Sequence, residues 1–195
     1  MNDSFLDVDF FSNYSNRVQE NLKNSDWTNV SKLANDMLDC WRLGNVIYLC
    51  GNGGSAGNAV HLANDFLYGV AKSIGKGMRV NALTANSSLI TCLANDVGYE
   101  SIFSEQLATL ANKGDLLVVF SGSGNSPNIL KVLEQAKIME VKSYAIVGFD
   151  GGKSKLMADI AIHFPVFDMQ ISEDFQLIVG HMLMQWLKKK TALDL

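Results

Sequence analysis

The chain has 195 residues, a length typical of one domain, and 48% of them are apolar, which excludes an intrinsically disordered protein. The formal net charge is −4 at pH 7, and the longest basic run is Lys188-Lys189-Lys190 near the C-terminus. Three lysines at the end of a predicted helix complement its dipole, so no nucleic-acid partner is expected. No apolar run reaches membrane-spanning length, and the polar start is unlike a signal peptide. We therefore expect a cytoplasmic protein with no membrane partner.

The first predicted elements are two helices between about residues 10 and 43. Apolar residues recur there at three- and four-residue spacing, and Gly44 closes the pattern. From about residue 45 to 190, short apolar runs that suit strands alternate with helical patterns. The predicted strands are 46–50, 78–83, 116–120, 143–147 and 160–164. The predicted helices are 55–68, 89–94, 102–111, 127–139, 156–158 and 172–190, with a loop over 95–99 and Pro127 in the first helical turn.

This alternation is typical of an α/β fold with a parallel sheet that carries helices on both faces. We expect a single domain over residues 1–195, made of the N-terminal helices and the α/β core. Cys40, Cys50 and Cys92 are odd in number and widely spaced, which predicts free thiols and a reducing compartment. Cys50 ends an apolar strand and is expected to be buried.

Two of the predicted strands run into loops of small residues. The first loop is Gly51-Asn52-Gly53-Gly54-Ser55, and the second is Ser121-Gly122-Ser123-Gly124-Asn125-Ser126. Such a loop presents N–H groups and hydroxyls beside a helix N-terminus, which suits a phosphate. The alternative is that the serines only form a tight turn and cap the helix. Two loops at the same edge of the sheet favour a phosphorylated ligand.

Other phosphate motifs fit less well. The pattern Gly51-x-Gly53-x-x-Ala56 matches a dinucleotide fingerprint, but the second strand ends without the acidic residue that binds the ribose. Neither loop contains the Gly-Lys-Ser/Thr of a P-loop.

Candidate acid–base and metal-binding residues lie on two of the predicted helices. His61 and Asp65 are four residues apart, so they share a helical face and could hold a metal ion. Glu173 and His181 lie on the last helix, where Asp174 is seven residues before His181. A single histidine on an apolar helix is more often a core residue, and acids at a helix start often complement its dipole.

Taken together, these motifs resemble those of the phosphoheptose isomerases, which are enzymes with a sugar-isomerase (SIS) domain. The resemblance covers nearly the whole chain. It rests on the two glycine loops and on His61, Asn95-Asp96-Val97-Gly98, Gly148-x-Asp150-Gly151-Gly152 and the helix from Glu173 to His181. It implies a flavodoxin-like sheet and a homotetramer with active sites between subunits. It also implies conversion of sedoheptulose 7-phosphate to glycero-manno-heptose 7-phosphate, the first step toward the heptose of lipopolysaccharide.

The resemblance also implies roles for individual residues. Asp65 would be the catalytic base and His181 its acid–base partner. Zn²⁺ would be held by His61, Asp65, Glu173 and His181, although many members have Glu and Gln at the positions of Asp65 and Glu173. An aspartate is one methylene shorter, which reduces its reach by about 1.5 Å, a shift that matters in catalysis. The implied substrate contacts are Asn52, Gly53, Gly54, Asp65, Asn95, Asp96, Ser121, Gly122, Ser123, Ser126 and Glu173, and Gly122 stands where many members carry Thr.

Two alternative functions remain open from the sequence. One SIS relative is a non-catalytic tetramer that binds the bacterial replication initiator, and this chain could resemble it. The other alternative is an isomerase of a different phosphosugar or a sugar-phosphate-sensing module, because positions 65, 122 and 173 depart from the family pattern. His163 lies in a predicted strand and is expected to be structural.

Overall fold

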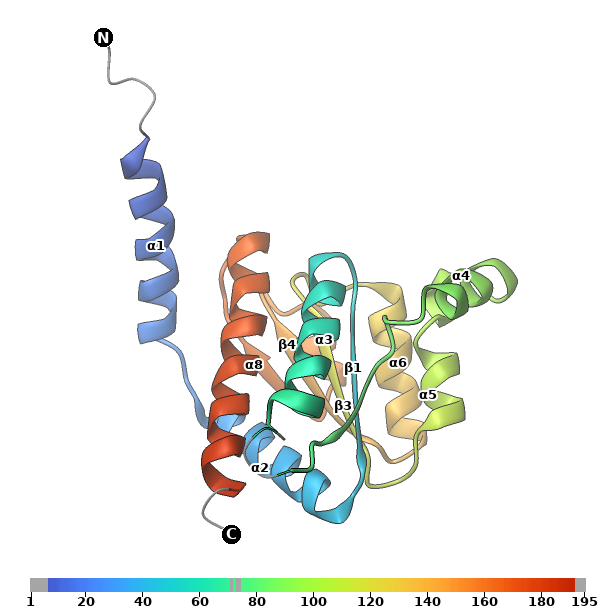
Figure 1. The fold of residues 1–195 in the computed structure, drawn as a ribbon. Coiled ribbons are helices and arrows are strands. Elements are labelled where there is room, and N and C mark those ends of the chain that lie inside the picture. The colour runs from blue at the N-terminus through green and yellow to red at the C-terminus, as the bar shows by residue number, and fades with distance from the viewer. Residues whose placement is uncertain (1–6, 71, 73–74, 192–195) are drawn as a thin grey trace.

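The computed structural model describes residues 7–70, 72 and 75–191, and this part of the chain forms a parallel five-stranded sheet flanked by helices (Figure 1). The strand order is β2-β1-β3-β4-β5. The strands are β1 (Val46–Gly51), β2 (Arg79–Ala82), β3 (Leu116–Ser121), β4 (Lys142–Val147) and β5 (Ile160–His163). This is the flavodoxin-like order, which confirms the predicted fold class. The chain reverses direction across the sheet between β1 and β3, and ligands bind at the carboxyl ends of strands beside such a point.

Helices connect the strands and extend the fold at both ends. They are α1 (Val8–Lys23), α2 (Thr28–Leu43), α3 (Gly54–Asn64), the π-helix η1 (Asp65–Gly69), α4 (Ser87–Asp96), the 3₁₀-helix η3 (Tyr99–Ser101), α5 (Ser104–Leu110), α6 (Pro127–Ile138), α7 (Ser154–Met157) and α8 (Met169–Thr191). Gly44 adopts a left-handed conformation after α2, and Pro127 opens α6, both as the sequence predicts. Most predicted boundaries lie within three residues of the observed ones.

Two predicted segments need correction. The helix predicted over 55–68 is an α-helix only as far as Asn64, because Val70 N–H bonds to Asp65 O at 3.0 Å and opens one wider π turn. The loop predicted over 95–99 begins later, since α4 continues to Asp96. The N–H groups of Val97 and Gly98 both bond to Leu93 O and end the helix there.

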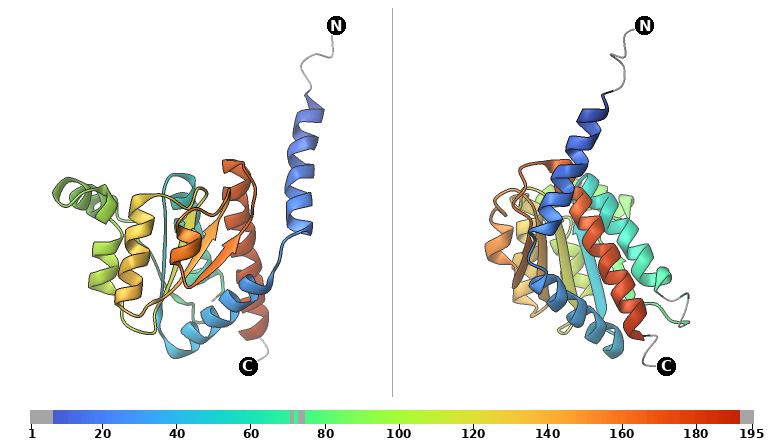
Figure 2. Two further views of the ribbon diagram at one scale, coloured as in Figure 1. Left: turned by 180° about the vertical axis from the view of Figure 1, so that it is seen from behind. Right: turned by 90° about the vertical axis from the view of Figure 1, so that its left-hand side faces the viewer.

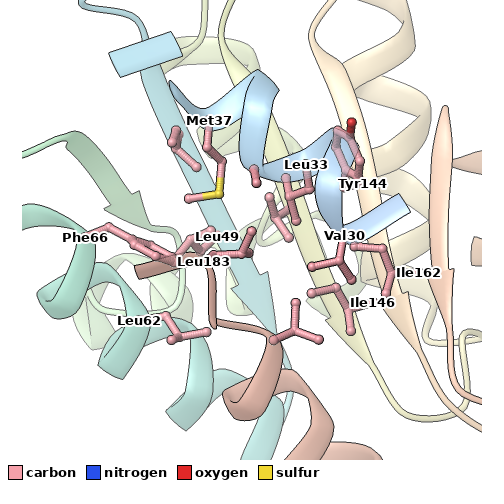
Figure 3. Close-up of a cluster of buried hydrophobic side chains, with 14 of the residues drawn as sticks. Val30, Leu33, Met37, Leu49, Leu62, Phe66, Tyr144, Ile146, Ile162 and Leu183 are labelled. Carbon is pink, nitrogen blue, oxygen red and sulfur yellow. The ribbon is translucent and has the colours of Figure 1, made fainter. Parts of the chain in front are cut away.

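Both faces of the sheet are buried. Alternate residues of each strand point to opposite sides, and helices cover each side. Leu49 and Val118 pack with α2, α3 and α8 on one face, and Figure 3 shows this cluster. Cys50 and Val119 pack with α5 and α6 on the other face. This double burial explains why the strands read as continuous apolar runs. Because β1 and β3 are parallel neighbours, the two glycine loops that follow them meet at one edge of the sheet.

Helix α1 projects beyond this layered body, although Tyr14, Val18 and Leu22 pack against it. Figures 1 and 2 show it extending beyond the first turn of α8, and none of its residues is buried. Its side chains Val8, Phe10 and Phe11 are more than 60% exposed. Helix α1 therefore leaves apolar surface uncovered in the single chain.

Within the described residues, no helix combines the length and apolar character needed to cross a membrane.

Candidate active site

A cavity of about 270 Å³ opens at the carboxyl ends of β1 and β3, between the two glycine loops. It is lined by Asn52, Gly53, Ser55, Phe120, Ser121, Gly122, Ser123, Ser126, Met169 and Glu173. Helices α3 and α6 both begin at this cavity. The positive ends of their two dipoles therefore favour an anion there. Among its lining residues Glu173 is the single charged side chain, so hydroxyls and helix ends would have to supply the attraction. The position matches the ligand site predicted from the sequence.

The serines of the second loop divide between structural and available hydroxyls. Ser121 Oγ accepts a bond from Gly124 N–H at 3.1 Å and is buried, so it helps to shape the turn. Ser123 Oγ makes a weaker contact of 3.4 Å with Asn125 N–H. Ser126 is the N-cap of α6, but its side chain makes no capping bond. The hydroxyl of Ser126 therefore lies at the cavity without the structural use that the capping alternative requires.

Glycines hold the second loop in a conformation that larger residues could not adopt. Gly124 has a φ of 66°, and a Cβ there would lie 2.1 Å from Gly151 O. The N–H of Ser154 also bonds to Gly124 O at 2.9 Å. These contacts join the second glycine loop to Gly151 and Ser154, which gives the Gly151-Gly152 motif a supporting role.

Hydrogen bonds between side-chain amides hold the first loop, in addition to its backbone contacts. Asn52 and buried Asn128 exchange two side-chain hydrogen bonds of 2.8 Å, and Tyr99 OH donates to Asn52 Oδ1 at 3.1 Å. Asn95 and Asp96, by contrast, lie on exposed turns of α4 and bond to each other at 2.8 Å. They are not among the residues that line the cavity, and their role as substrate contacts stays a prediction.

Helices α3 and α8 run side by side from the cavity, in the same direction (Figure 1). Near the cavity, Gln176 donates to Ser55 Oγ at 3.0 Å and accepts from Asn58 at 2.9 Å. One turn further along, a Cβ on Gly180 would lie 2.2 Å from Leu62 Cδ2, so the helices are in close contact there. This packing brings His61, which precedes Leu62, close to His181, which follows Gly180.

Three predicted site residues meet at this helix pair. His61 Nε2 and His181 Nε2 are 3.0 Å apart, and each lies 3.6 Å from Asp65 Oδ2. The imidazole side chains are 49% and 46% exposed, whereas that of Asp65 is 16% exposed. Asp65 also begins the π turn, an irregularity that is frequent at functional sites. The exposed imidazoles make this cluster accessible from the surface.

The donor set fits a zinc ion by its geometry. Tetrahedral Zn²⁺ with bonds of about 2.0–2.2 Å separates its ligand atoms by about 3.4 Å, close to the 3.0 and 3.6 Å separations found here. Two imidazoles and one carboxylate leave a fourth position open, as in catalytic zinc sites. Among the described residues, these three form the cluster whose ligand atoms all lie within 4.8 Å.

Glu173 lies outside this cluster. Its carboxylate is against Gly54, where an added Cβ would be 2.2 Å from Oε2. Glu173 is thus a lining residue of the cavity, and it contacts the predicted substrate residue Gly54. Because Gly54 begins α3, the carboxylate lies at the positive end of that helix.

Sequence reasoning missed Ser55, Phe120 and Met169 as lining residues. A Cβ on Gly122 would lie 2.4 Å from Met169 Sδ, so this thioether fills the space beside Gly122. The signal for Ser55 was its place in the first glycine loop. Met169 had no such signal, because it reaches the cavity from the start of α8, far along the chain.

His163 and the three cysteines lie outside the cavity and the histidine cluster. His163 Nε2 is 2.9 Å from Phe149 O, and its Nδ1 is 3.1 Å from Lys155 Nζ, consistent with a structural role. All three cysteines lie in the described part and are free thiols. Burial raises the pKa of Cys50 and keeps that thiol protonated and unreactive.

Sequence comparisons show which known proteins the chain is similar to. The SIS domain family model matches residues 10–148. The phosphoheptose isomerase of Helicobacter pylori (strain P12) is 39% identical over 146 residues, which are 75% of this chain and 76% of that protein. The phosphoheptose isomerase of Akkermansia muciniphila is 37% identical over 161 residues, which are 83% and 85% of the two chains.

Solved structures extend the similarity to the fold. A phosphoheptose isomerase from Francisella tularensis superposes with a TM-score of 0.87 at 27% identity, covering 93% of this chain and 96% of that one. Phosphoheptose isomerase GmhA from Neisseria gonorrhoeae gives a TM-score of 0.84 at 29% identity, covering 93% and 97%.

Proposed function

The chain belongs to the SIS-domain family, among relatives that are phosphoheptose isomerases, and we propose that it interconverts D-sedoheptulose 7-phosphate and D-glycero-D-manno-heptose 7-phosphate. This would be the first step of heptose biosynthesis for lipopolysaccharide. The observation that carries the proposal is the His61–Asp65–His181 cluster, which lies on the same helix pair as the phosphate cavity. We propose further that residues 1–195 act as one SIS domain.

The substrate would lie along α3 and α8. Its phosphate would bind at Ser121, Ser123 and Ser126, between the N-termini of α3 and α6. His61 lies seven residues after Gly54 on α3, a distance of about 10 Å along the helix axis. An extended heptose chain could span that distance, which would bring its carbonyl end to the imidazoles. Asn52, Gly53, Gly54 and Glu173 would contact the carbons between.

The proposed reaction is a proton transfer through an enediol. Asp65 removes a proton from C1 of the ketose, and His181 protonates the oxygen on C2. The C1 hydroxyl then returns a proton to His181, and Asp65 delivers its proton to C2. The aldose forms and both side chains recover their starting states. The exposed imidazoles and the less exposed carboxylate, 3.6 Å apart, are within reach of one substrate.

We propose zinc as the cofactor, one ion per subunit. His61, Asp65 and His181 would hold it, and Glu173 would be a further oxygen ligand if its side chain turned from Gly54 toward the cluster. When bound, zinc would polarise the carbonyl and stabilise negative charge on the enediolate oxygen. Glu in place of Gln at position 173 adds negative charge, which favours a cation.

We propose a homotetramer in the cytoplasm, with active sites between subunits. The half-exposed imidazoles leave one side of the cluster for a neighbouring chain. A groove of about 220 Å³ between α2 and α8 is lined by Trp27, Met182 and Trp186, among others. The exposed apolar residues of α1 add a second uncovered surface. The three free thiols are typical of a reducing compartment.

Proton NMR of the purified protein with sedoheptulose 7-phosphate tests this function. The aldose signal should grow with zinc supplied and should stop growing when a chelator is added. Conversion that is unaffected by the chelator would contradict the zinc proposal. No conversion with zinc present would contradict the function and favour an isomerase of another phosphosugar or the non-catalytic alternative.

A further inference from the structure

Helix α1 makes two polar contacts with the segment that closes the cavity. Tyr14 OH donates to Asp174 Oδ2 at 2.6 Å, and Arg17 Nη2 pairs with Asp168 Oδ2. The partners are 160 and 151 residues apart in sequence. Asp168 and Asp174 lie on either side of Met169 and Glu173, the two lining residues that α8 contributes to the cavity.

Asp168 also holds the beginning of α8. Its second oxygen, Oδ1, accepts from Ile171 N–H at 3.1 Å, and its carbonyl accepts from Ser172 Oγ at 2.7 Å. The Arg17 guanidinium and the Ile171 N–H hold the pKa of Asp168 below its usual range, so it is ionised at neutral pH. One carboxylate therefore joins α1 to the first turn of α8 by a charge-assisted bond.

The hydrogen bond from Tyr14 to Asp174 also persists at neutral pH. Burial and the hydrogen bond to Asp174 raise the pKa of Tyr14 to about 12, so the phenol keeps the proton that it donates. Tyr14 is also one of the α1 residues that pack against the apolar cluster beneath α8. Because α1 itself contains no buried residue, these contacts could be lost without opening the core.

From this arrangement we infer that Tyr14 and Arg17 are positioning residues: they hold the first turn of α8 so that Met169 and Glu173 form the outer wall of the anion cavity. The wall faces the loop of Ser121 to Ser126, and Met169 Sδ packs beside Gly122. A looser wall would admit water and weaken the ligand's hold without touching the His61–Asp65–His181 cluster. The inference uses the anion cavity of the proposed function.

Arg17→Ala and Tyr14→Phe test the inference, with Lys23→Ala as the matched control. Lys23 is an exposed cation on the same helix, and its removal changes the charge by the same amount as Arg17→Ala. Calorimetry with inorganic phosphate measures the Kd of an anion at the cavity. Kinetics with sedoheptulose 7-phosphate separates effects on KM from effects on kcat. Arg17→Lys should restore much of the binding, because the ammonium can still reach the carboxylate.

We expect each of Arg17→Ala and Tyr14→Phe to raise Kd and KM about fivefold while kcat changes less than about twofold. The melting temperature and the value for Lys23→Ala should stay near wild type. A phosphate Kd within about twofold of wild type in both variants would overturn the inference. If the wild type binds phosphate but does not convert the sugar, the proposed function fails, while the phosphate measurement still decides this inference.

Discussion

Ser123 is the residue that best separates phosphate binding from loop structure. Its hydroxyl makes one long contact of 3.4 Å within the loop, whereas Ser121 is buried and supports the turn. We expect Ser123→Ala to weaken sugar-phosphate binding by about 1–3 kcal/mol, the cost of a lost hydrogen bond to a charged group, with little change in stability. Calorimetry measures the binding, and thermal denaturation measures the stability.

Thr109→Ala is the matched control for that substitution. Thr109 lies on an exposed face of α5, and its hydroxyl donates back to Glu105 O at 3.0 Å. Thr109→Ala therefore also removes a hydroxyl, but from a residue that does not line the cavity. Equal losses of affinity in the two variants would show that the Ser123 hydroxyl has no particular role.

The three cysteines should differ sharply in reactivity. Cys92 is exposed, whereas Cys40 and Cys50 are buried, so one thiol per folded chain should react with a disulfide reagent and three after denaturation. The hydrogen bond from Cys92 to Asp96 raises the pKa of this thiol, which lowers its thiolate fraction at any pH below that pKa. Asp96→Asn should therefore speed the reaction at mildly alkaline pH, and an unchanged or slower rate would contradict this.

At the scale of residues, the sequence predicted where the two small-residue loops lie better than it predicted all the residues that line the cavity. The hydroxyls and glycines that line the cavity follow local rules for strand ends and helix starts. Met169 and the present position of Glu173 depend on how α8 packs against Gly122 and Gly54, and no local pattern encodes that packing. Asn95 and Asp96 likewise came from the resemblance, and they lie away from the cavity in a single chain.

Among the elements, the contact of α3 with α8 determines whether the acid–base cluster forms. Gly180 allows this contact, because a Cβ there would collide with the side chain of buried Leu62. We expect Gly180→Ala to destabilise the fold by about 1–3 kcal/mol, as overpacking does. It should also weaken zinc binding, since His61 and His181 are the neighbours of the two contact residues. Thermal denaturation and a zinc titration measure the two effects.

Gly57→Ala is the control for this prediction. Gly57 lies on the same helix pair, and a Cβ there meets no atom within 4 Å. Alanine has the higher helix propensity, so Gly57→Ala should be neutral or stabilising by up to about 1 kcal/mol. Similar melting temperatures for the two variants would contradict the close helix contact.

Elements were largely predictable because each has its own periodic pattern. The strands are continuous apolar runs that are buried on both faces. In the long helices, apolar residues recur every three to four positions. The π turn at Asp65 was not predictable from local periodicity. Gly69, at its end, packs where a Cβ would lie 2.7 Å from Met184 Cε of α8, so tertiary contact accompanies the wider turn.

At the scale of the whole molecule, we predict association of four chains. Light scattering at micromolar concentration should give about four times the 21.4 kDa of one chain. Phe11→Glu should shift the protein to smaller species if α1 takes part, because Phe11 is 69% exposed in the single chain. A monomeric wild-type protein would contradict both the tetramer and an active site shared between subunits.

The meeting of α3 and α8 could not be derived from the sequence pattern alone. Their residues are more than 100 positions apart, and only the resemblance brought His61 and His181 to one cleft before the structure did so. The parallel sheet, in contrast, follows from the order of elements, which places both glycine loops at one edge.

The most direct test of the account is the turnover of Asp65→Asn beside the wild-type protein in deuterated water. With sedoheptulose 7-phosphate, the wild-type protein should form the aldose with deuterium at C2, because the proton held on Asp65 exchanges with solvent. Asp65→Asn should keep the fold and the phosphate affinity but lower kcat by about 10²-fold or more, as expected when a general base is lost. Full turnover by Asp65→Asn would contradict the assignment of Asp65 as the base.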